Sequence, residues 1–415
     1  MRELIPDARR ALLLLGGSRQ QVVAIEVARK CGYRTVLCDY LEDNPGRHYA
    51  DSFHLVSTVD REAVLEVARR EEVEGVIAYS SDPASPTAAY VAERLGMLTN
   101  PLAAVEIMST KSLFRRHLHE VGLPCPLAAS FEAGASAAEV ECLVEGFRWP
   151  LVVKPTDSSG SKGVSVVTEP TQMPAALEHA GANSRNGILI AEEYIERAFP
   201  NVVGGDIFVV DGMIRFWGLM RCLRDSKASL VPVGKAIPSG LSEGQLSKVK
   251  ETLQLLVSSL GIRFGELNVE VIIGDGDVPY VLELGSRAGG NMIPVQLGDA
   301  SGIDLVRANV MCAMGDDPGG ISWDPEDVYF ATHVLHTLKD GTYEGYELSA
   351  AAEVACYREV VYQEAGAPVH HFDGANKALG ILFFEFEKQE SFEDYIANTS
   401  NHVRVMVDSS TDGRK

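Results

Sequence analysis

The sequence predicts a protein of several domains, in which a parallel α/β domain is followed by larger α+β parts. The chain has 415 residues, which is more than a single hydrophobic core usually supports. Its N-terminal part alternates short apolar runs with helical periodicity, as parallel α/β units do, whereas its later parts are richer in strands. Because 46% of the residues are hydrophobic and 23% are charged, the composition is that of a folded globular protein.

The first domain is expected over residues 1–100. Its predicted elements, in order, are a strand at 11–15, a helix at 20–31, a strand at 35–39, a helix at 61–71, a strand at 75–79 and a helix at 86–96. Gly16-Gly17 after the first strand and Asp39 at the end of the second also occur in dinucleotide-binding folds. The third glycine and the G-x-G spacing of those folds are missing here, so a tight turn between strand and helix is the favoured interpretation.

Residues 80–83, Ser-Ser-Asp-Pro, follow the third strand at the edge where open α/β sheets bind ligands. Two interpretations stay open for this segment. It either faces an active site or caps the next helix.

Four further parts are expected after residue 100. A linking helix in 101–124, from about 102 to 121, ends at Gly122-Leu-Pro124, a sequence that stops helices. A small unit at 125–190 is followed by a large unit at 191–325 and by a C-terminal β-rich part at 326–415 that packs on the large unit. The predicted strands are 151–153, 164–167, 188–191, 206–210, 214–219, 266–273, 280–284, 329–336, 379–386 and 403–407, and the predicted helices are 243–260 and 392–397.

The net charge of −21 repels both a nucleic-acid backbone and an anionic membrane surface, so neither is expected as a partner. A bound polyanion would need basic groups and metal ions concentrated around it. The seven cysteines are scattered without metal-ligand spacing, which indicates reduced thiols. The apolar run at 11–15 is too short for a signal peptide or a membrane span, and a cytoplasmic protein is therefore expected.

Lys154 ends a run of apolar residues, where its ammonium group would be desolvated without an anion. The loop 156–163 follows at once, and Gly160 and Gly163 allow its backbone N–H groups to approach phosphate oxygens closely. The loop lacks the Walker A pattern, and alone it would indicate only a hairpin turn. Its place behind a strand-end lysine favours phosphate binding. By contrast, Lys111 would by itself be a solvated lysine of the linking helix.

Residues 266–273 and 280–287 are predicted to form two antiparallel strands joined by a short turn. On the second strand, alternation puts Tyr280, Leu282 and Leu284 on the face opposite Glu283, Gly285 and Arg287. With the turn centred on Gly276 and Asp277, Glu270 lies opposite Glu283, and Asn268 lies opposite Gly285. Both glutamates then project from one face.

Glutamates opposed in this way repel each other unless a cation lies between them, because their Cβ atoms are roughly 5 Å apart. Oxygen ligands without nearby His or Cys favour Mg²⁺ or Mn²⁺, completed by water and phosphate oxygens. The alternative for this segment is an exposed hairpin whose charges face solvent.

Five features resemble the ATP-grasp superfamily in their order and rough spacing, and within it most closely the carboxylate–amine ligases. They are Lys111, Lys154 with its glycine loop, the segment 188–195, Asn268-x-Glu270 and Glu283-x-x-x-Arg287. The resemblance extends over nearly the whole chain. It implies an ATP-grasp fold preceded by a Rossmann-like parallel α/β domain.

The resemblance also implies the cofactors, the partners and the residues that bind them. The implied cofactors are ATP and Mg²⁺ (or Mn²⁺), in two ions, the implied partners are a small-molecule carboxylate and an amine, and a homodimer is compatible with it. The implied ATP-binding residues are Lys111, Lys154, Ser158, Ser159, Gly160 and Gly163 at the phosphates, and Glu192, Glu193 and Ile195 at the adenine. Glu270 and Glu283 are the implied metal ligands, and Arg287 is the implied catalytic residue, which neutralises the acyl phosphate and the tetrahedral intermediate.

Two positions depart from the family pattern. Gly285 stands where many relatives carry a metal-binding asparagine, so one metal ligand must come from elsewhere or be water, and Asn291 is the candidate residue. The segment 197–205 looks like an insertion at the place where an acidic residue usually binds ribose, and Asp206 is the expected replacement there.

The implied activity is that of an ATP-dependent ligase. A carboxylate attacks the γ-phosphate to form an acyl phosphate, and an amine then displaces phosphate, so that ADP and phosphate are released. No protein nucleophile is required, which agrees with the lack of a Ser-His-Asp or Cys-His pattern. Two alternatives stay open: a carboxylase or formyl-transferring ligase of the same fold, and an ATP-binding regulatory protein without turnover.

Overall fold

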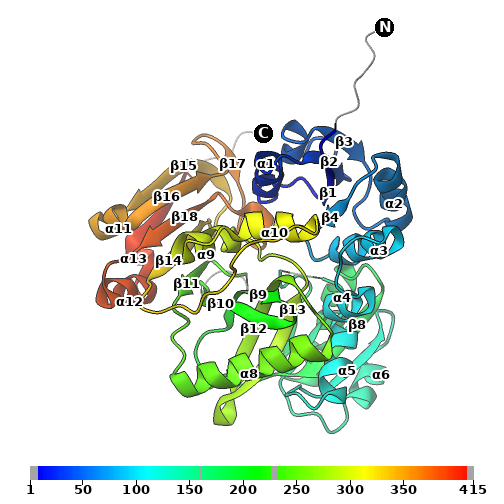
Figure 1. Ribbon diagram of the computed structural model, residues 1–415. Coiled ribbons are helices and arrows are strands. Elements are labelled where there is room, and N and C mark those ends of the chain that lie inside the picture. Colours follow the sequence, from blue (N-terminus) through cyan, green and yellow to red (C-terminus); the bar gives the residue numbers. More distant parts are fainter. Residues whose placement is uncertain (1–7, 159, 226–230, 409–415) are drawn as a thin grey trace, which may run out of the picture.

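Figure 1 shows the computed structural model, which describes residues 8–158, 160–225 and 231–408. The N-terminal domain, blue in the figure, contains a parallel four-stranded sheet in the order β3-β2-β1-β4. Its elements are β1 (Ala11–Leu15), α1 (Val22–Lys30), β2 (Arg34–Asp39), β3 (Ser52–Leu55), α2 (Arg61–Arg70), β4 (Gly75–Ile77) and α3 (Ser85–Leu95). All five residues of β1 are buried because helices cover both faces of the sheet. The predicted parallel α/β domain is confirmed, but β3 and the short 3-10 helix η1 (Pro45–His48) before it were not predicted.

The glycine turn after β1 is occupied by side chains of the same domain. The backbone N–H of Gly17 donates to Oδ2 of Asp39 at 2.7 Å, and the N–H of Leu41 donates to Oδ1 at 2.8 Å. A Cβ atom on Gly17 would lie 2.0 Å from Oδ1 of Asn44. Because Asp39 holds two backbone groups and Asn44 fills the turn, the interpretation as a tight turn is confirmed.

The linking segment forms two helices instead of the predicted single helix. These are α4 (Leu102–Ser109) and α5 (Lys111–Glu120). They are separated by Thr110, whose φ of −128° and ψ of 109° are extended. The break lets the N–H of Lys111 donate to the carbonyl of Thr156 at 2.9 Å. Lys111 therefore opens α5 beside the glycine loop, whereas the sequence placed it inside a continuous helix.

The small subdomain is an antiparallel four-stranded sheet in the order β5-β8-β6-β7. Its elements are β5 (Ala128–Glu132), α6 (Ala137–Leu143), β6 (Leu151–Pro155), β7 (Ser165–Val167), α7 (Met173–Ala182) and β8 (Ile188–Glu193). The predicted boundary between residues 190 and 191 is wrong, because β8 pairs along its length with β5 and β6 and ends at Glu193. The small subdomain therefore extends three residues further.

One eight-stranded sheet, in the order β13-β12-β9-β10-β11-β14-β18-β16, joins the large subdomain to the C-terminal part. The elements of the large subdomain are β9 (Val203–Val210), β10 (Met213–Leu223), β11 (Gly234–Ile237), α8 (Glu243–Ser259), β12 (Gly265–Gly274), β13 (Val278–Gly285), α9 (Ile293–Ser301) and α10 (Leu305–Ala313). The C-terminal elements are β14 (Phe330–Leu335), β15 (Gly341–Leu348), α11 (Ala350–Ala355), β16 (Cys356–Val361), β17 (Pro368–Val369), β18 (Gly380–Glu385), α12 (Gln389–Ala397), α13 (Thr399–His402) and β19 (Val403–Asp408). The predicted boundary between 325 and 326 therefore divides strands of a single sheet, since β11 pairs with β14.

The large sheet is covered differently on its two faces. Helix α8 packs on one face against apolar residues of β9, β12 and β13. On the other face, α9 and α10 cover part of the sheet, and α10 also packs against α1 and β1 of the N-terminal domain (Figure 1). The rest of that face carries the polar residues described below. Among the described residues, no helix has the length and apolar character required to cross a membrane.

Candidate functional site

The hairpin of β12 and β13 places two carboxylates side by side. Glu270 pairs with Glu283, and Asn268 pairs with Gly285, as the alternation predicted. Both glutamates are partly buried, and they lie on the face opposite fully buried Val269. The two carboxylates therefore project together from the side of the sheet that α8 leaves uncovered.

A bulge that the sequence did not reveal sets this register. The turn comprises residues 275–277, and Leu282 is an extra residue, because the next pair along the hairpin is Val271–Val281. The predicted sorting of the second strand is therefore wrong on the turn side of the bulge. Val281 is in the core at 2% exposure, whereas Tyr280 is only partly buried.

The charges around Glu283 disfavour its ionised form when no cation is present. Burial raises the pKa of Glu283, and the nearby carboxylates of Asp82 and Glu270 raise it further. Lys111 and Arg287 oppose this rise without cancelling it. A divalent cation beside the two glutamates would relieve the repulsion.

The third expected ligand does not join the hairpin. The backbone N–H of Asn291 donates to Oε1 of Gln20 at 2.7 Å, and its Oδ1 accepts from Nε2 of the same residue at 3.2 Å. Asn291 therefore contacts the N-terminal domain. Within the described ranges, no group of three or more His, Cys, Asp or Glu side chains could hold a metal ion. The structure thus provides two carboxylates without a third protein ligand of these types.

Lys111 contacts the glycine loop from the first position of α5. Its Nζ donates to the carbonyl oxygen of Ser158 at 2.5 Å. Gly160 and Gly163 have φ angles of 67° and 73°, and a Cβ atom on Gly163 would lie 2.8 Å from carbon atoms of two neighbouring side chains. Glycine at 163 is therefore required both by its conformation and by space. Ser159, also expected to bind phosphate, lies outside the described residues.

Lys154 belongs to a buried ionic cluster with Glu192 and Arg115. Nζ of Lys154 donates to Oε1 of Glu192, and Nε of Arg115 donates to Oε2 at 2.9 Å. Burial alone would raise the pKa of Glu192, but Arg115 and then Lys154 lower it to about 2. Burial lowers the pKa of Lys154, and Arg115 and Lys111 add to this effect while Glu192 opposes it. Two cations therefore already hold the Glu192 carboxylate, which the resemblance placed at the adenine.

The sequence analysis missed Arg115. It follows Lys111 by four residues in α5, so both side chains lie on one side of the helix. Arg115 is 3% exposed between the buried residues Phe114 and Leu118. An arginine next to the apolar face of an amphipathic helix was the available indication.

The other expected adenine residues lie at the end of β8. Glu193 accepts a hydrogen bond from the backbone N–H of Arg148 at 2.8 Å and another from its guanidinium at 3.0 Å. Ile195 follows β8 in the connection to the large subdomain. Their contact with adenine stays a prediction.

Arg287 pairs with Asp82 of the N-terminal domain. Its Nε and one Nη donate to the two carboxylate oxygens at 2.7 and 2.6 Å. Burial lowers the pKa of Arg287, but Asp82 outweighs burial and raises it. Ser80 also crosses this boundary, because its Oγ donates to the carbonyl of Gly289 at 2.9 Å. Of the two interpretations of residues 80–83, the structure therefore supports the one in which they face the site.

Asp206 does not have the position expected of a ribose-binding residue. It is fully buried at 0% exposure, and its oxygens accept hydrogen bonds from Nδ2 of Asn268 at 2.7 Å and from the N–H of Gly289 at 2.9 Å. These bonds hold the segment after β13 against the sheet. The geometry favours a structural role for Asp206.

Lys235 on β11 is a second cation that the sequence analysis missed. It is 6% exposed, and its Nζ donates to Sγ of Cys222 at 2.7 Å. Burial lowers the pKa of Lys235, but Cys222, Glu270 and Asp206 together raise it above its usual value. A Cβ atom on Gly204 would lie 2.6 Å from both Nζ and Sγ, so glycine there makes room for the pair. A buried positive charge therefore lies near the carboxylate hairpin.

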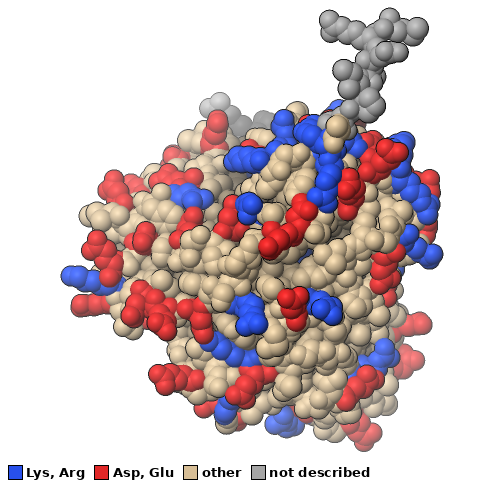
Figure 2. Space-filling model, in the orientation of Figure 1, with Lys and Arg blue, Asp and Glu red and all other residues tan. Residues whose placement is uncertain are grey.

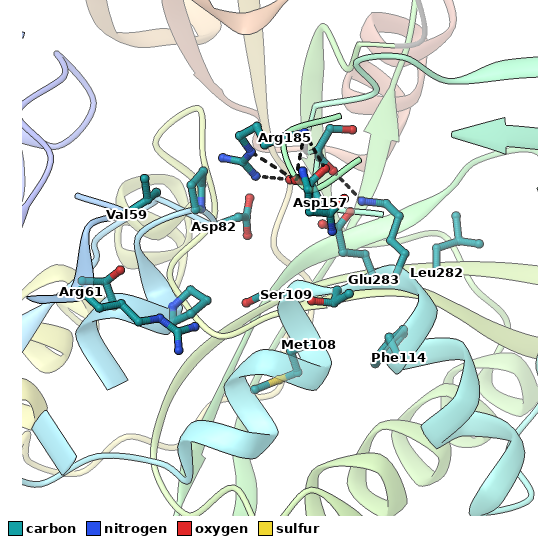
Figure 3. Close-up of a pocket in the computed structure, with 18 residues that line it drawn as sticks. Val59, Arg61, Asp82, Met108, Ser109, Phe114, Asp157, Arg185, Leu282 and Glu283 are labelled. Carbon is teal, nitrogen blue, oxygen red and sulfur yellow. Dashed lines mark hydrogen bonds and ion pairs between the residues drawn. The ribbon is translucent and has the colours of Figure 1, made fainter. Parts of the chain in front are cut away.

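A pocket of about 380 Å³ opens between the N-terminal domain, α4, α5, the glycine loop and the hairpin (Figure 3). Asp82, Met108, Phe114, Asp157 and Glu283 are among its walls in the figure. Lys111 and Ser158 also line it. The structure thus brings residues from five separate segments of the sequence, within 59–87, 108–114, 157–158, 185–186 and 282–285, to one cavity.

The face of the molecule drawn in Figure 2 agrees with the acidic charge of the sequence. On the face drawn in Figure 2, basic side chains occur singly or in small groups among acidic ones. The cations of the site are therefore a local feature of an acidic protein with a net charge of −21.

Comparisons with known proteins agree with this architecture. Residues 108–291 match the family described as an ATP-grasp domain. The carbamoyl phosphate synthase large chain of Thermotoga maritima is 24% identical over 335 residues, a match that includes 75% of this chain and 29% of that protein. The formate-dependent phosphoribosylglycinamide formyltransferase of Synechococcus sp. strain WH7803 is 34% identical over 188 residues, or 45% of this chain and 48% of that protein. The chain thus spans less than half of the length of each of these relatives.

Solved structures resemble nearly the whole chain. The L-amino acid ligase from Bacillus licheniformis superposes with a TM-score of 0.78 over 96% of this chain and 99% of that one, at 19% identity. The biotin carboxylase domain of the Hydrogenobacter thermophilus 2-oxoglutarate carboxylase, described as a dimer in complex with MgADP, ADP and bicarbonate, gives a TM-score of 0.74 over 96% and 91% at 14% identity. These likenesses show the shared fold.

Proposed function

Because this chain is an ATP-grasp protein by its domain match and by its fold, we propose that it is an ATP-dependent carboxylate–amine ligase. It would activate a small-molecule carboxylate as an acyl phosphate and join the acyl group to an amine, with release of ADP and phosphate. The observation that carries the proposal is the Glu270–Glu283 pair, which lies next to a cavity lined by Lys111. Opposed carboxylates whose repulsion a cation would relieve, in a cavity that a lysine also lines, fit a metal-bound polyphosphate.

The cations favour a bound polyphosphate. Lys111, Lys154 and Arg115 lie near one another, and Glu192 is the carboxylate that both Lys154 and Arg115 contact. This leaves an excess of positive charge in a buried region, which a phosphate chain would offset. Lys111 and the glycine loop would hold the phosphates through the ammonium group and backbone N–H groups.

The hairpin suits a divalent metal. Glu270 and Glu283 would hold Mg²⁺ or Mn²⁺ through oxygen ligands, with the remaining positions filled by water and phosphate oxygens. A metal bound there would offset negative charge on the transferring phosphoryl group. We propose two such ions, as the resemblance implies. The raised pKa of Glu283 supports a site that requires a cation.

Arg287 is proposed to neutralise the acyl phosphate and the tetrahedral intermediate. Arg287 does not itself line the cavity, but its partner Asp82 does, so the guanidinium lies behind that part of the wall. An anionic intermediate would therefore share Arg287 with Asp82. The loop 156–163 would exclude water from the acyl phosphate and so limit its hydrolysis.

A second candidate is a ligase of the same fold that uses formate or bicarbonate as its acid. The names of two similar proteins favour it, because one is a formate-dependent formyltransferase and the other is a carboxylase domain in complex with bicarbonate. A regulatory protein without turnover is disfavoured, since Lys154, Glu270, Glu283 and Arg287 are all present. A cytoplasmic location and a homodimer stay proposals.

The decisive experiment is a screen of acid and amine pairs for phosphate release from ATP. Release that depends on both an acid and an amine is expected. Release that depends on formate or bicarbonate would favour the second candidate. If no pair in a broad screen supports release above the ATP-only rate while MgATP binds, the ligase proposal would be wrong. Glu283→Gln serves as the inactive control.

A further inference from the structure

Arg115 lies between the two halves of the site without lining the cavity. It is 3% exposed, and its guanidinium makes hydrogen bonds in two directions. Toward the small subdomain it contacts both oxygens of Glu192 on β8, from Nε at 2.9 Å and from Nη2 at 3.4 Å. Toward the large subdomain, Nη1 donates to the carbonyl of Leu282 at 3.0 Å and approaches the carbonyl of Val281 at 3.5 Å.

The second direction matters because Leu282 is the bulge of β13. A bulge leaves its extra residue out of the regular ladder of backbone hydrogen bonds, so its carbonyl needs another donor. Arg115 supplies that donor. Glu283 follows directly, and its register opposite Glu270 exists only because of the bulge.

The planar guanidinium of an arginine suits the position between Glu192 and Leu282. A guanidinium has donors pointing in several fixed directions, whereas a lysine ammonium on a flexible stem cannot hold a carboxylate and a backbone carbonyl on opposite sides with the same geometry. The charge itself would be kept by lysine. The two functions of Arg115, charge and fork geometry, can therefore be separated by substitution.

We propose that Arg115 is a positioning residue that fixes the bulge at Leu282, and with it the metal-binding geometry of Glu283, while it holds Glu192 beside Lys154. This inference rests on the proposed nucleotide and metal site. Binding of phosphate at the lysines and binding of metal at the hairpin are then coupled through one side chain. Helix α5 carries both residues, because Lys111, which would bind phosphate, lies one turn before Arg115, which would position the metal ligand.

The test uses Mn²⁺ as the metal and the non-hydrolysable analogue adenylyl imidodiphosphate as the nucleotide. Free Mn²⁺ is measured by electron paramagnetic resonance in the full-length chain at saturating nucleotide. Arg115→Lys should weaken Mn²⁺ binding by about tenfold, because one or two hydrogen bonds from a charged donor are lost. Affinity for the nucleotide without metal should stay within about threefold, because the positive charge beside Glu192 is kept.

The neighbouring Arg116 offers a matched control on the same helix. Its side chain is 67% exposed and contacts only Glu120, at 4.0 Å, among the ion pairs of the described chain. Arg116→Lys should change neither affinity. A thermal midpoint without ligand is recorded for each variant, because loss of Mn²⁺ binding counts only for a folded protein.

Glu192→Gln keeps the result interpretable if Arg115→Lys does not fold. Glutamine keeps the shape of Glu192 but weakens its hold on Arg115, so Mn²⁺ affinity should fall severalfold although Glu192 lies on the other subdomain. Unchanged Mn²⁺ affinity in the folded variants would overturn the role of Arg115. If the wild-type chain itself binds no Mn²⁺ with the nucleotide, the proposed function fails and this inference fails with it.

Discussion

Glu283→Gln removes one of the two opposed carboxylates and leaves the shape of the hairpin. It should lower turnover at least roughly a hundredfold, the range seen when one charge-stabilising group is lost from a site. The fold should remain, because Glu283 faces the cavity while the buried neighbours Val281 and Leu284 hold β13 in the core. Asp275→Asn is the matched control, since it removes a carboxylate from the exposed turn of the same hairpin.

Stability should respond to pH in a defined direction. Burial, together with Asp82 and Glu270, raises the folded-state pKa of Glu283 above its usual value of 4.5. The folded state therefore holds the proton more tightly than the unfolded state, so this group costs stability as the pH rises through the folded-state pKa. Glu283→Gln removes that cost. Without ligand, the variant should match or exceed the wild type at neutral pH, and its advantage should vanish below about pH 4.5.

Stabilisation by MgATP should change in the opposite sense. At a ligand concentration of about 100 times Kd, binding to the folded state alone contributes about 2.7 kcal/mol, and a hundredfold weaker affinity would leave about 0.4 kcal/mol. The lost stabilisation of about 2.3 kcal/mol corresponds to a thermal midpoint shift of about 3 °C for a chain of 415 residues. Differential scanning fluorimetry with and without MgATP measures both effects. A variant that melts far lower without ligand and keeps its specific activity would make Glu283 structural and refute the metal site.

Further predictions concern the metal and the buried charges. High-affinity ATP binding measured by calorimetry should require Mg²⁺ or Mn²⁺ and should become much weaker in EDTA, because a chain of net charge −21 repels free ATP; equal affinity in both conditions would contradict this. Lys154→Ala should weaken nucleotide binding at least about tenfold, whereas Cys38→Ser, in the core of the N-terminal domain, should not; similar losses would remove the special role of the lysine. Asp82→Asn should destabilise the chain by about 3 kcal/mol in urea unfolding, because Arg287 keeps its buried charge without a paired carboxylate; an unchanged midpoint would contradict the pairing. Arg115 and Lys154 outweigh burial and lower the pKa of Glu192 to about 2. The ionised carboxylate therefore stabilises the fold at any pH above its unfolded-state pKa. Glu192→Gln should cost stability at neutral pH but not near pH 2.

Local patterns in the sequence were enough to predict much of the carboxylate hairpin. Alternation along β12 put Asn268 and Glu270 on one face, and the Glu270–Glu283 pair was predicted correctly because the bulge offsets a turn one residue longer than predicted. The bulge at Leu282 was not predictable. It follows from the donor that Arg115 supplies from another part of the chain.

Contacts between distant segments explain the other errors. The break at Thr110 depends on the hydrogen bond between Lys111 and Thr156, which no helical propensity encodes. The boundary at residue 190 was wrong because β8 pairs with β5 and β6 in the small subdomain, and the composition of β8 alone does not indicate these partners. Asn291 and Asp206 were expected to bind ligands. In the structure Asn291 is hydrogen-bonded to Gln20, and Asp206 accepts hydrogen bonds from Asn268 and Gly289.

The sequence by itself determined the parallel N-terminal domain, the lysine followed by a glycine loop, and the paired glutamates, because each depends on spacing within a few dozen residues. Only the tertiary structure decided which charges meet. Arg115 was missed and Asp82 was left open because their partners lie 77 and 205 positions away, and a buried charge is recognised only once its partner is known. Hydrophobic periodicity specifies which face of an element is buried, whereas the partner of a buried ion depends on how the elements pack together.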